Sequence, residues 1–293
     1  MDFYGRLRLG LLGLIAIGSV TGEWYAAATE QHDEVGCTQV GATAALPGLP
    51  EASGVAVSMR SPGVLWTMND SGDPELIAVD SAGVMKGRVR VSGATVHDWE
   101  AISSARCDGR ACLYIADIGD NNATRKNITV YRVPEPTPGD QETQPAEAFI
   151  ATYPDGAHDA EALFVNRDGG LMIVTKEKPS AVYRFPEPMK PGTIVRLEPA
   201  GMLPIQSVTD AETSRDGEWI AVRTHAELFF FRNEEFALGA HGSPIKLAKV
   251  GEPKGEGVAL GENGRVYLVG EGKHHQPGTL ATLQCSFPDA SSK

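Results

Sequence analysis

Paired acids with the pattern Asp-x-Glu are the residues best suited to do chemistry in this chain. The pattern occurs in "HDWEAI" from residue 97, "HDAEAL" from 158 and "TDAETS" from 209, with a relative, "KGEGVA", from 254. In a strand, residues two apart share a face, so both acids of a pair lie side by side. Like charges that close raise each other's pKa unless a cation or a proton compensates. The recurrence therefore predicts either a cation site or a repeated structural bond.

Aligning the motifs places one acid of each unit in a shared column. The column reads Ser53 (from a weaker copy, "EASGVA"), Glu100, Glu161, Glu212 and Glu256. Two positions earlier stand Glu51, Asp98, Asp159, Asp210 and Lys254. Hard cations such as Ca²⁺ take roughly 6–8 oxygen ligands. We therefore predict a calcium site on some of the acids Asp98, Glu100, Asp159, Glu161, Asp210, Glu212 and Glu256. In the alternative, which does not exclude the first, the acids bond backbone N–H groups of the next unit and hold the units in register.

A second column varies where the acidic column is constant, as expected for a site built on a scaffold. It reads Asn69, Asp117, Thr175, Arg223 and Gly270, followed by Asp70, Ile118, Lys176, Thr224 and Glu271. Lys176, Arg223 and His225 are predicted to bind an anion beside the metal. Asn69 is predicted to contact the ligand, and Glu161 or Asp117 to act as a catalytic base. The alternative is that "NDSGDPE" and "DIGDNN" are turns held by Asx hydrogen bonds and that Lys176 is solvated.

The elements that must position these residues are short strands repeated along the chain. Each motif leads into apolar runs rich in Val, Ile, Tyr and Phe and bounded by Gly, Pro, Asn or Asp. The second run of each unit covers residues 64–70, 113–119, 171–177, 219–225 and 266–272. Several short strands per unit, at a period of about 40–50 residues, are typical of a β-propeller. We predict an all-β propeller of five blades, with a sixth, degenerate blade as the alternative.

The cysteines agree with a closed ring. The fifth unit lacks a fourth strand, and the segment "CTQVGATAALPG" from Cys37 resembles the strand that is missing. We predict that this N-terminal strand joins the last blade and that a disulfide links Cys37 to Cys285. Cys107 and Cys112 flank a turn-like stretch, "DGRA", which predicts a second disulfide. Zinc is the alternative, but no C-x-x-C pair is present.

The start of the chain resembles an export signal. Arg6 and Arg8 precede the apolar residues 9–20, and Ala26, Ala27 and Ala28 suit a cleavage site. We predict a signal peptide at residues 1–28 and a single propeller domain at residues 29–293, secreted or periplasmic. An uncleaved anchor is the alternative, although twelve apolar residues are short for a membrane span.

The charge limits the partners. A formal net charge of −12 argues against a wide basic face for nucleic acid and against strong attraction to anionic membranes. We expect no nucleic acid partner and no stable membrane span, and we expect a monomer. The expected partner is a small or anionic ligand, or a cell-envelope protein.

The motifs "EASGVA", "NDSG", "DWEAI", "DIGDN" and "VYRVPEP" together resemble exported bacterial β-propellers of the phytase-like and SdiA-regulated (esterase-like) type. The resemblance covers most of residues 50–285. It implies a propeller fold, calcium binding, an extracytoplasmic location and hydrolysis of phosphate esters. Well-studied phytase propellers have six blades, whereas five repeats are found here, and a full set of phosphate-binding residues does not map onto this chain.

These observations lead to one functional prediction and one rival. The prediction is a propeller with a calcium site near its channel that either binds a small or anionic ligand there or hydrolyses a phosphate or carboxylic ester. The rival is a non-enzymatic cell-envelope scaffold in which the repeated acids are structural.

Overall fold

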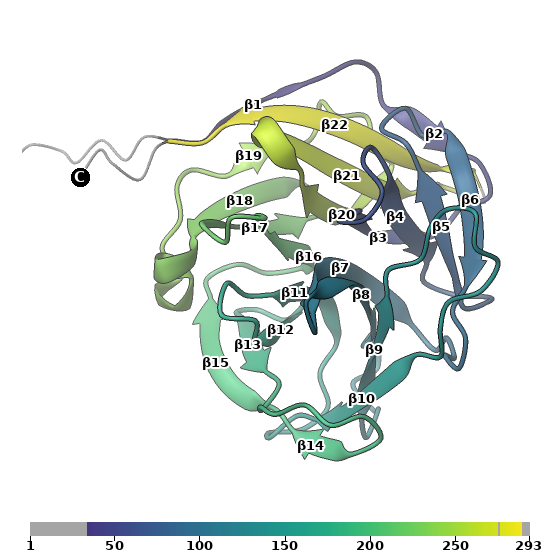
Figure 1. Cartoon of the computed structure of the whole chain (residues 1–293). Coiled ribbons are helices and arrows are strands. Elements are labelled where there is room, and N and C mark those ends of the chain that lie inside the picture. Colours follow the sequence, from purple (N-terminus) through teal and green to yellow (C-terminus); the bar gives the residue numbers. More distant parts are fainter. Residues whose placement is uncertain (1–33, 275, 289–293) are drawn as a thin grey trace, which may run out of the picture. The chain divides into compact units, whose positions relative to one another are not determined.

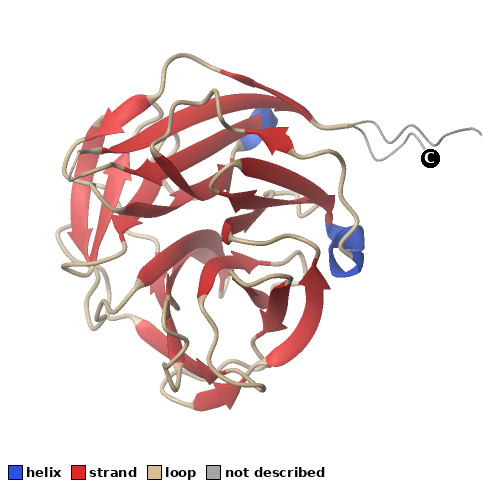
Figure 2. Cartoon of the chain, turned by 180° about the vertical axis from the view of Figure 1, so that it is seen from behind, coloured by secondary structure: helices blue, strands red, loops and turns tan. Residues whose placement is uncertain are grey.

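The computed structural model describes residues 34–274 and 276–288, so the predicted signal peptide lies outside the described residues. Nearly all regular structure in the described part is β-strand, as Figures 1 and 2 show from opposite sides. Two short 3₁₀ helices, η1 (Asn233–Leu238) and η2 (Glu262–Gly264), are the helical elements found there.

The strands form five sheets, each built around an antiparallel meander of strands close together in sequence. The first sheet contains β3 (Ala52–Val57), β4 (Leu65–Asn69), β5 (Glu75–Val79) and β6 (Met85–Arg90). The second contains β7 (Trp99–Cys107), β8 (Arg110–Asp117), β9 (Ile128–Pro134) and β10 (Glu147–Thr152), with β14 (Ile194–Arg196) added in parallel to β10. The third contains β11 (Ala160–Val165), β12 (Leu171–Thr175), β13 (Ser180–Arg184) and β15 (Glu198–Leu203). The fourth contains β16 (Val208–Thr213), β17 (Trp219–Thr224), β18 (Glu227–Arg232) and β19 (Ile245–Lys246). The fifth contains β20 (Lys254–Leu260), β21 (Arg265–Glu271), β22 (Gly278–Ser286) and β1 (Gly36–Gln39), with β2 (Ala44–Leu46) also paired to β22.

The five sheets are the blades of a propeller. The first strand of each blade lies beside the first strand of the next, in the order β3, β7, β11, β16, β20 and back to β3 (Figure 1). The prediction of an all-β propeller with five blades is confirmed. The alternative of a sixth blade is wrong, because the described strands form five sheets and the fifth closes onto the first.

The ring closes where the cysteines predicted it. Strand β1 pairs antiparallel with β22, with Cys37 opposite Cys285, and a disulfide joins the two. The second predicted disulfide, Cys107–Cys112, joins the ends of β7 and β8. Both predicted disulfides are therefore confirmed, and the N-terminal strand completes the last blade.

The hydrophobic core consists of five clusters, one between each pair of neighbouring blades. Between the first two blades, for example, Trp66 and Leu76 pack with Trp99 and Ile115. Because each sheet is covered on both faces, its middle strands are apolar throughout rather than alternating. Strand β12 is the clearest case, since all five of its residues are buried.

Candidate functional site

A β-bulge near the start of every innermost strand aims one side chain in each blade at the channel. The pairing with the second strand skips one residue at Glu100, at Glu161 and at Glu256, and breaks in the same way at Ser53–Gly54 and at Thr209. Bulges of this kind re-aim a side chain and are common next to active sites. The column of equivalent residues is therefore Ser53, Glu100, Glu161, Thr209 and Glu256.

The predicted place of Glu212 in this column is wrong, because strand register puts Thr209 there. Two matching hydrogen bonds support the new register. Ser53 Oγ donates to the carbonyl of Glu100 (2.9 Å), and Thr209 Oγ1 donates to the carbonyl of Glu256 (2.8 Å). In both pairs the residues are 47 positions apart. Hydroxyl groups thus occupy two blades, and glutamates the other three.

Glu212 lies farther along the channel. Its Oε1 accepts hydrogen bonds from Ser103 Oγ of β7 and from the backbone N of Thr213, both at 3.2 Å. Its Oε2 is buried without a partner among the described residues. Burial raises the pKa of Glu212 to about 8, so the side chain is largely neutral at pH 7.

Two other predicted site residues join blades instead of facing the channel mouth. Asp210 is buried, and its carboxylate accepts hydrogen bonds from the backbone N of Ala211 (2.9 Å) and of Val258 on the next blade (2.8 Å). Arg223 is fully buried, bonds the carbonyls of Gly257 and Val269, and forms an ion pair with Glu252. The contacts of Asp210 match the alternative in which the repeated acids bond backbone N–H groups of the next blade. Because its own contacts bury Arg223, a ligand cannot reach it.

The second column also shifts by one residue in the fourth blade. Thr224 pairs with Val208 as Thr175 pairs with Ala160, so His225 takes the position that Lys176 has in the third blade. We call the group of charged side chains at the start of the innermost strands the axial mouth. Its members are Asp70, Asp98, Glu100, Asp159, Glu161, Lys176, His225, Lys254, Glu256 and Glu271. Seven of the residues predicted for the metal or ligand lie in this group.

Asp98 and Glu100 form the most strongly perturbed pair of the axial mouth. Burial first, and then Glu161, Asp98 and Glu256, raise the pKa of Glu100 to about 10. Burial also raises the pKa of Asp98, although a hydrogen bond with Glu100 opposes this. At neutral pH Glu100 therefore keeps its proton, and a hydrogen bond joins the two carboxyl groups. A side chain at Gly119 would collide with both, so this glycine leaves the room in which they lie.

Glu161 and Lys176 form an ion pair in the third blade. Burial raises the pKa of Glu161 to about 7, and Lys176 limits the rise. For Lys176, burial lowers the pKa, but Glu161 and Asp159 outweigh it and the net shift is upward. The pair can hold a proton near neutral pH, the property that a general base or acid requires.

The fifth blade adds a lysine between two acids. Lys254 Nζ lies 2.7 Å from Glu256 Oε1 and 2.7 Å from Glu271 Oε1, and His225 Nδ1 lies 3.7 Å from Glu256 Oε2. Across the mouth, burial and Glu51 raise the pKa of Asp70 to about 7. The Oδ1 atom of Asp70 is buried without a hydrogen-bond partner among the described residues.

Asp117 and Asn69 bind backbone groups next to the axial mouth and do not face into it. The buried carboxylate of Asp117 accepts from the backbone N of His97 (3.1 Å) and of Asp98 (3.3 Å), and it pairs with Arg125 at 2.8 Å. Asn69 Oδ1 accepts from the backbone N of Glu51 at 3.1 Å. Both side chains accept from the backbone of the preceding strand's start and not from their own turns, so the Asx alternative does not describe these two residues. Asp117 positions Asp98 and has little freedom to act as a base.

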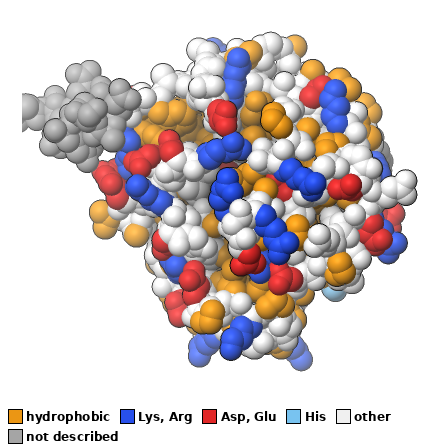
Figure 3. All heavy atoms as spheres, in the orientation of Figure 1, with side chains coloured by type: hydrophobic (Ala, Val, Ile, Leu, Met, Phe, Trp, Pro, Cys, Tyr) orange, Lys and Arg blue, Asp and Glu red, His pale blue; other side chains and the backbone are white. Residues whose placement is uncertain are grey.

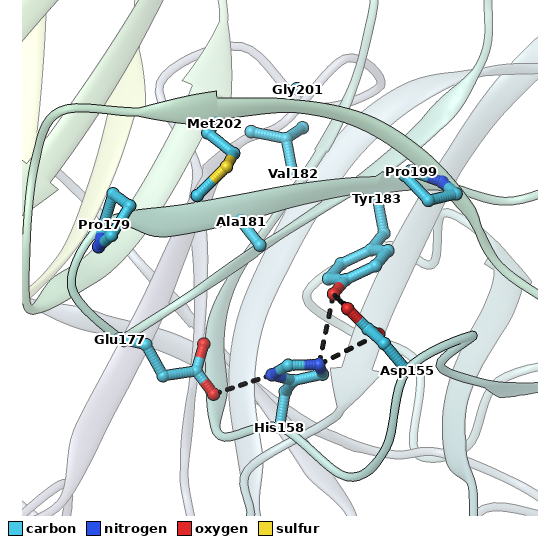
Figure 4. Close-up of a pocket in the computed structure, with 10 residues that line it drawn as sticks. All are labelled: Asp155, His158, Glu177, Pro179, Ala181, Val182, Tyr183, Pro199, Gly201 and Met202. Atoms are coloured by element: carbon cyan, nitrogen blue, oxygen red, sulfur yellow. Dashed lines mark hydrogen bonds and ion pairs between the residues drawn. The ribbon is translucent and has the colours of Figure 1, made fainter.

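A cavity of about 380 Å³ lies in the third blade beside the mouth (Figure 4). We call it the outer pocket and define it by Asp155, His158, Glu177, Tyr183 and Met202. His158 Nδ1 bonds Glu177 at 2.9 Å, and its Nε2 bonds Asp155 at 3.1 Å and the hydroxyl of Tyr183 at 3.1 Å. Burial lowers the pKa of His158, but these two acids outweigh it and the net pKa is raised.

The outer pocket adjoins the axial mouth through the chain itself, since His158 precedes Asp159 and Glu177 follows Lys176. Sequence reasoning missed it. The available signal was the histidine that opens both "HDWEAI" and "HDAEAL".

Among the described residues, no group of three or more His, Cys, Asp and Glu side chains has an arrangement that could hold a metal ion. No helix in this part of the chain is long and apolar enough to cross a membrane.

Comparison with known proteins supports the fold. No family model and no curated protein matches the sequence. Among solved structures, the GH43_1 enzyme from Xanthomonas citri complexed with xylose is similar with a TM-score of 0.53 and 12% identity, over 86% of this chain and 92% of that one. The PQQ-bound aldose sugar dehydrogenase from Streptomyces coelicolor is similar with a TM-score of 0.50 and 11% identity, over 86% and 99%. Such identities support the architecture alone, and the likeness to phytase-like propellers remains a resemblance of motifs.

Proposed function

We propose that this propeller binds calcium at the axial mouth, through Asp98 and Glu100, and uses it to bind and hydrolyse a small ester that carries an anionic group. The observation that carries the proposal is the Asp98–Glu100 pair. These two carboxyl groups lie together in a mouth that holds more acids than bases, and the proton on Glu100 limits their repulsion. A hard divalent cation would replace that proton.

The residues present fit calcium by their donor type, and the ion would have to draw them together, because no three of the described His, Cys, Asp and Glu side chains are already arranged to hold a metal. Carboxylate oxygens are the ligands that calcium prefers. Asp98 and Glu100 supply two carboxyl groups, and the unpartnered Asp70 Oδ1 supplies an oxygen close enough for Asp70 to affect the pKa of Glu100. The absence of a side chain at Gly119 leaves room beside the pair. Glu161 and Glu256 are less available, because lysines already neutralise them.

The cation explains how an acidic mouth would accept an anionic ligand. Without it, the acids repel an anion, whereas Lys176, Lys254 and His225 favour one once the acids are neutralised. When bound, calcium would polarise the ester and offset the charge of the anion. The outer pocket has the size to hold the rest of the ligand, with Tyr183 and His158 as polar contacts.

Glu161 is the side chain best suited to accept a proton from the attacking water. Its pKa of about 7 places it near the operating pH, where a general base is most effective. Lys176, which is paired with Glu161, would hold the proton that Glu161 accepts close to the site.

The proposed extracytoplasmic location follows from the predicted export signal, and the two disulfides are consistent with an oxidising compartment.

The rival, a scaffold with structural acids, is supported by Asp210 and Arg223, whose contacts join blades. It does not account for the outer pocket or for the concentration of acids at the mouth.

The test combines calcium binding and activity. Calcium at 100 times its Kd should stabilise the protein by about 2.7 kcal/mol, and chromogenic phosphate or carboxylic esters should be cleaved with calcium and not with EDTA. The double variant Asp98→Asn/Glu100→Gln should lose both effects. Glu161→Gln should keep the calcium stabilisation and lose activity by about 100-fold.

Glu212→Gln is the matched control, because Glu212 is a buried channel glutamate outside the mouth. It should keep both effects. Equal calcium stabilisation in the double variant and the wild type would overturn the proposed site, and ester cleavage unaffected by EDTA would overturn the role of the cation.

A further inference from the structure

A second cavity, of about 450 Å³, lies on the opposite face of the propeller, where the innermost strands end. Three arginines line it. Arg60 follows β3, Arg106 lies near the end of β7, and Arg110 begins β8. Figure 3 shows the face toward which the end of the β7–β8 hairpin projects in Figure 1, with several Lys and Arg side chains close together near its middle. We call this cavity the arginine pocket.

The charges of these three arginines are not neutralised by carboxylates. Arg60 donates to the carbonyl of Glu135 (2.8 Å), and Arg106 donates to the carbonyl of Gly109 (3.2 Å). Within the described part of the chain, none of the three forms an ion pair, whereas the nearby Arg215 pairs with Glu262 at 2.6 Å. In a protein with a net charge of −12, three unpaired arginines around one cavity are a local exception.

The acids nearby do not change this. Glu135, in the pocket wall, is buried, and its oxygens accept from Trp66 Nε1 (2.9 Å), the backbone N of Met59 (3.0 Å) and of Arg60 (3.2 Å), and Ser58 Oγ. It is occupied in shaping the turn after β3. Asp140 is fully exposed and bonds Thr137, and Arg60 contributes only the smallest of the effects that lower its pKa.

A disulfide holds two of the arginines in place. The turn between β7 and β8 consists of Asp108 and Gly109, both with positive φ (48° and 79°). The Cys107–Cys112 bridge crosses the two strands of this hairpin diagonally, next to Arg106 on β7 and around Arg110 on β8. A rigid hairpin loses less conformational entropy when its side chains bind a ligand.

We propose that the arginine pocket binds a tetrahedral oxyanion, a phosphate or sulfate group on a small molecule. Guanidinium groups present planar pairs of donors that match the oxygens of such a group, and several of them favour a dianion. The pocket lies on the other face from the axial mouth, uses no calcium and does not depend on the proposed hydrolysis.

Titration calorimetry with inorganic phosphate, in EDTA and at low salt, tests the proposal. The wild type should bind phosphate, and raising the salt should weaken binding. Arg106→Gln/Arg110→Gln should raise the Kd by about a hundredfold or more, since each lost charge-assisted bond is worth about tenfold or more. Sulfate and a sugar phosphate, run as separate arms, distinguish a bare anion site from one that also contacts the organic part.

The matched control is Arg215→Gln, which removes a paired arginine from the same face and should leave the Kd unchanged. Cys107→Ser/Cys112→Ser should weaken binding while the protein remains folded. The proposal is overturned if the wild type does not bind phosphate, or if Arg215→Gln weakens binding as much as the double arginine variant does. An unchanged melting temperature in the arginine variants keeps loss of binding separate from loss of folding. The cysteine variant, which should melt at a lower temperature, is shown to be folded by a circular dichroism spectrum equal to that of the wild type.

Discussion

Asp98 and Glu100 show how neighbours change what a residue can do. Two acids side by side suggest an acid/base pair, yet Glu100 is nine-tenths buried and keeps its proton to about pH 10. Glu161, in the equivalent position one blade on, has a lysine beside it and a pKa of about 7. The same column therefore offers a site for a cation in one blade and a proton acceptor in the next.

The raised pKa of Glu100 predicts a pH dependence of stability. In the unfolded chain Glu100 loses its proton near its usual pKa of 4.5, whereas the folded protein retains it to about pH 10. Stability should therefore fall as pH rises from 4.5 toward 10, because the folded state binds the extra proton. In EDTA, the free energy of unfolding of Glu100→Gln minus that of the wild type should increase by at least about 1 kcal/mol from pH 5 to pH 8.

Urea denaturation at pH 5, 6.5 and 8 measures this difference. Glu198→Gln, an exposed change on β15, serves as control and should follow the wild type at each pH. If the wild type and Glu100→Gln lose stability in parallel, the burial of Glu100 is not the cause of the slope.

Among the elements, the strands and their order could be predicted from the sequence, but the register at their starts could not. Apolar runs report burial between blades, and five of them repeat clearly. A bulge adds one residue to a strand without changing its apolar pattern. An alignment of "TDAETS" by its acids therefore misses that Thr209 takes the bulge position. Thr175–Lys176 and Thr224–His225 are the better guide, since in each pair the threonine ends a buried strand and the basic residue follows it.

The same one-residue shift of register explains why the predicted role of Arg223 as an anion ligand is wrong. Aligned as a mouth residue, it resembled an anion ligand, but its register position in the other blades is held by Met68, Ala116, Val174 and Val269. An arginine in that position must be buried and must find partners, which it does in Glu252 and two carbonyls. Sequence alone cannot reveal this, because Glu252 lies outside the repeat motif.

The clamp between β17 and β20 makes a prediction at this scale. Arg223→Leu would leave the carboxylate of Glu252, whose side chain is 4% exposed, buried without its partner. The loss of unfolding free energy should be about 3–5 kcal/mol, and Arg223→Leu/Glu252→Leu should recover much of it.

Lys246→Gln removes a cation from an ion pair whose lysine is 74% exposed and is the matched control, with a loss below about 1 kcal/mol. Guanidinium denaturation compares the four proteins. A double variant no more stable than Arg223→Leu would show that Glu252 is not what makes the arginine necessary.

For the whole molecule, the decisive feature is that one chain end completes the blade begun by the other. Each blade packs against two neighbours, so the ring is stable only if the fifth blade holds both the first and the fourth. Cys37, Cys285 and the missing fourth strand allowed the closure to be predicted from the sequence. The two pockets could not be predicted, because each combines residues from loops and strands that have no common motif.

Ring closure predicts that the two disulfides contribute different amounts to the free energy of unfolding. Cys37–Cys285 closes a loop with a sequence separation of 248, and Cys107–Cys112 one of only 5. By loop entropy, the first should contribute about 5 kcal/mol to the free energy of unfolding and the second about 2 kcal/mol. Denaturation of Cys37→Ser/Cys285→Ser and Cys107→Ser/Cys112→Ser measures both. Equal losses would mean that β1 holds to β22 by its hydrogen bonds and packing alone, and that the covalent link adds little to a ring the blades already close.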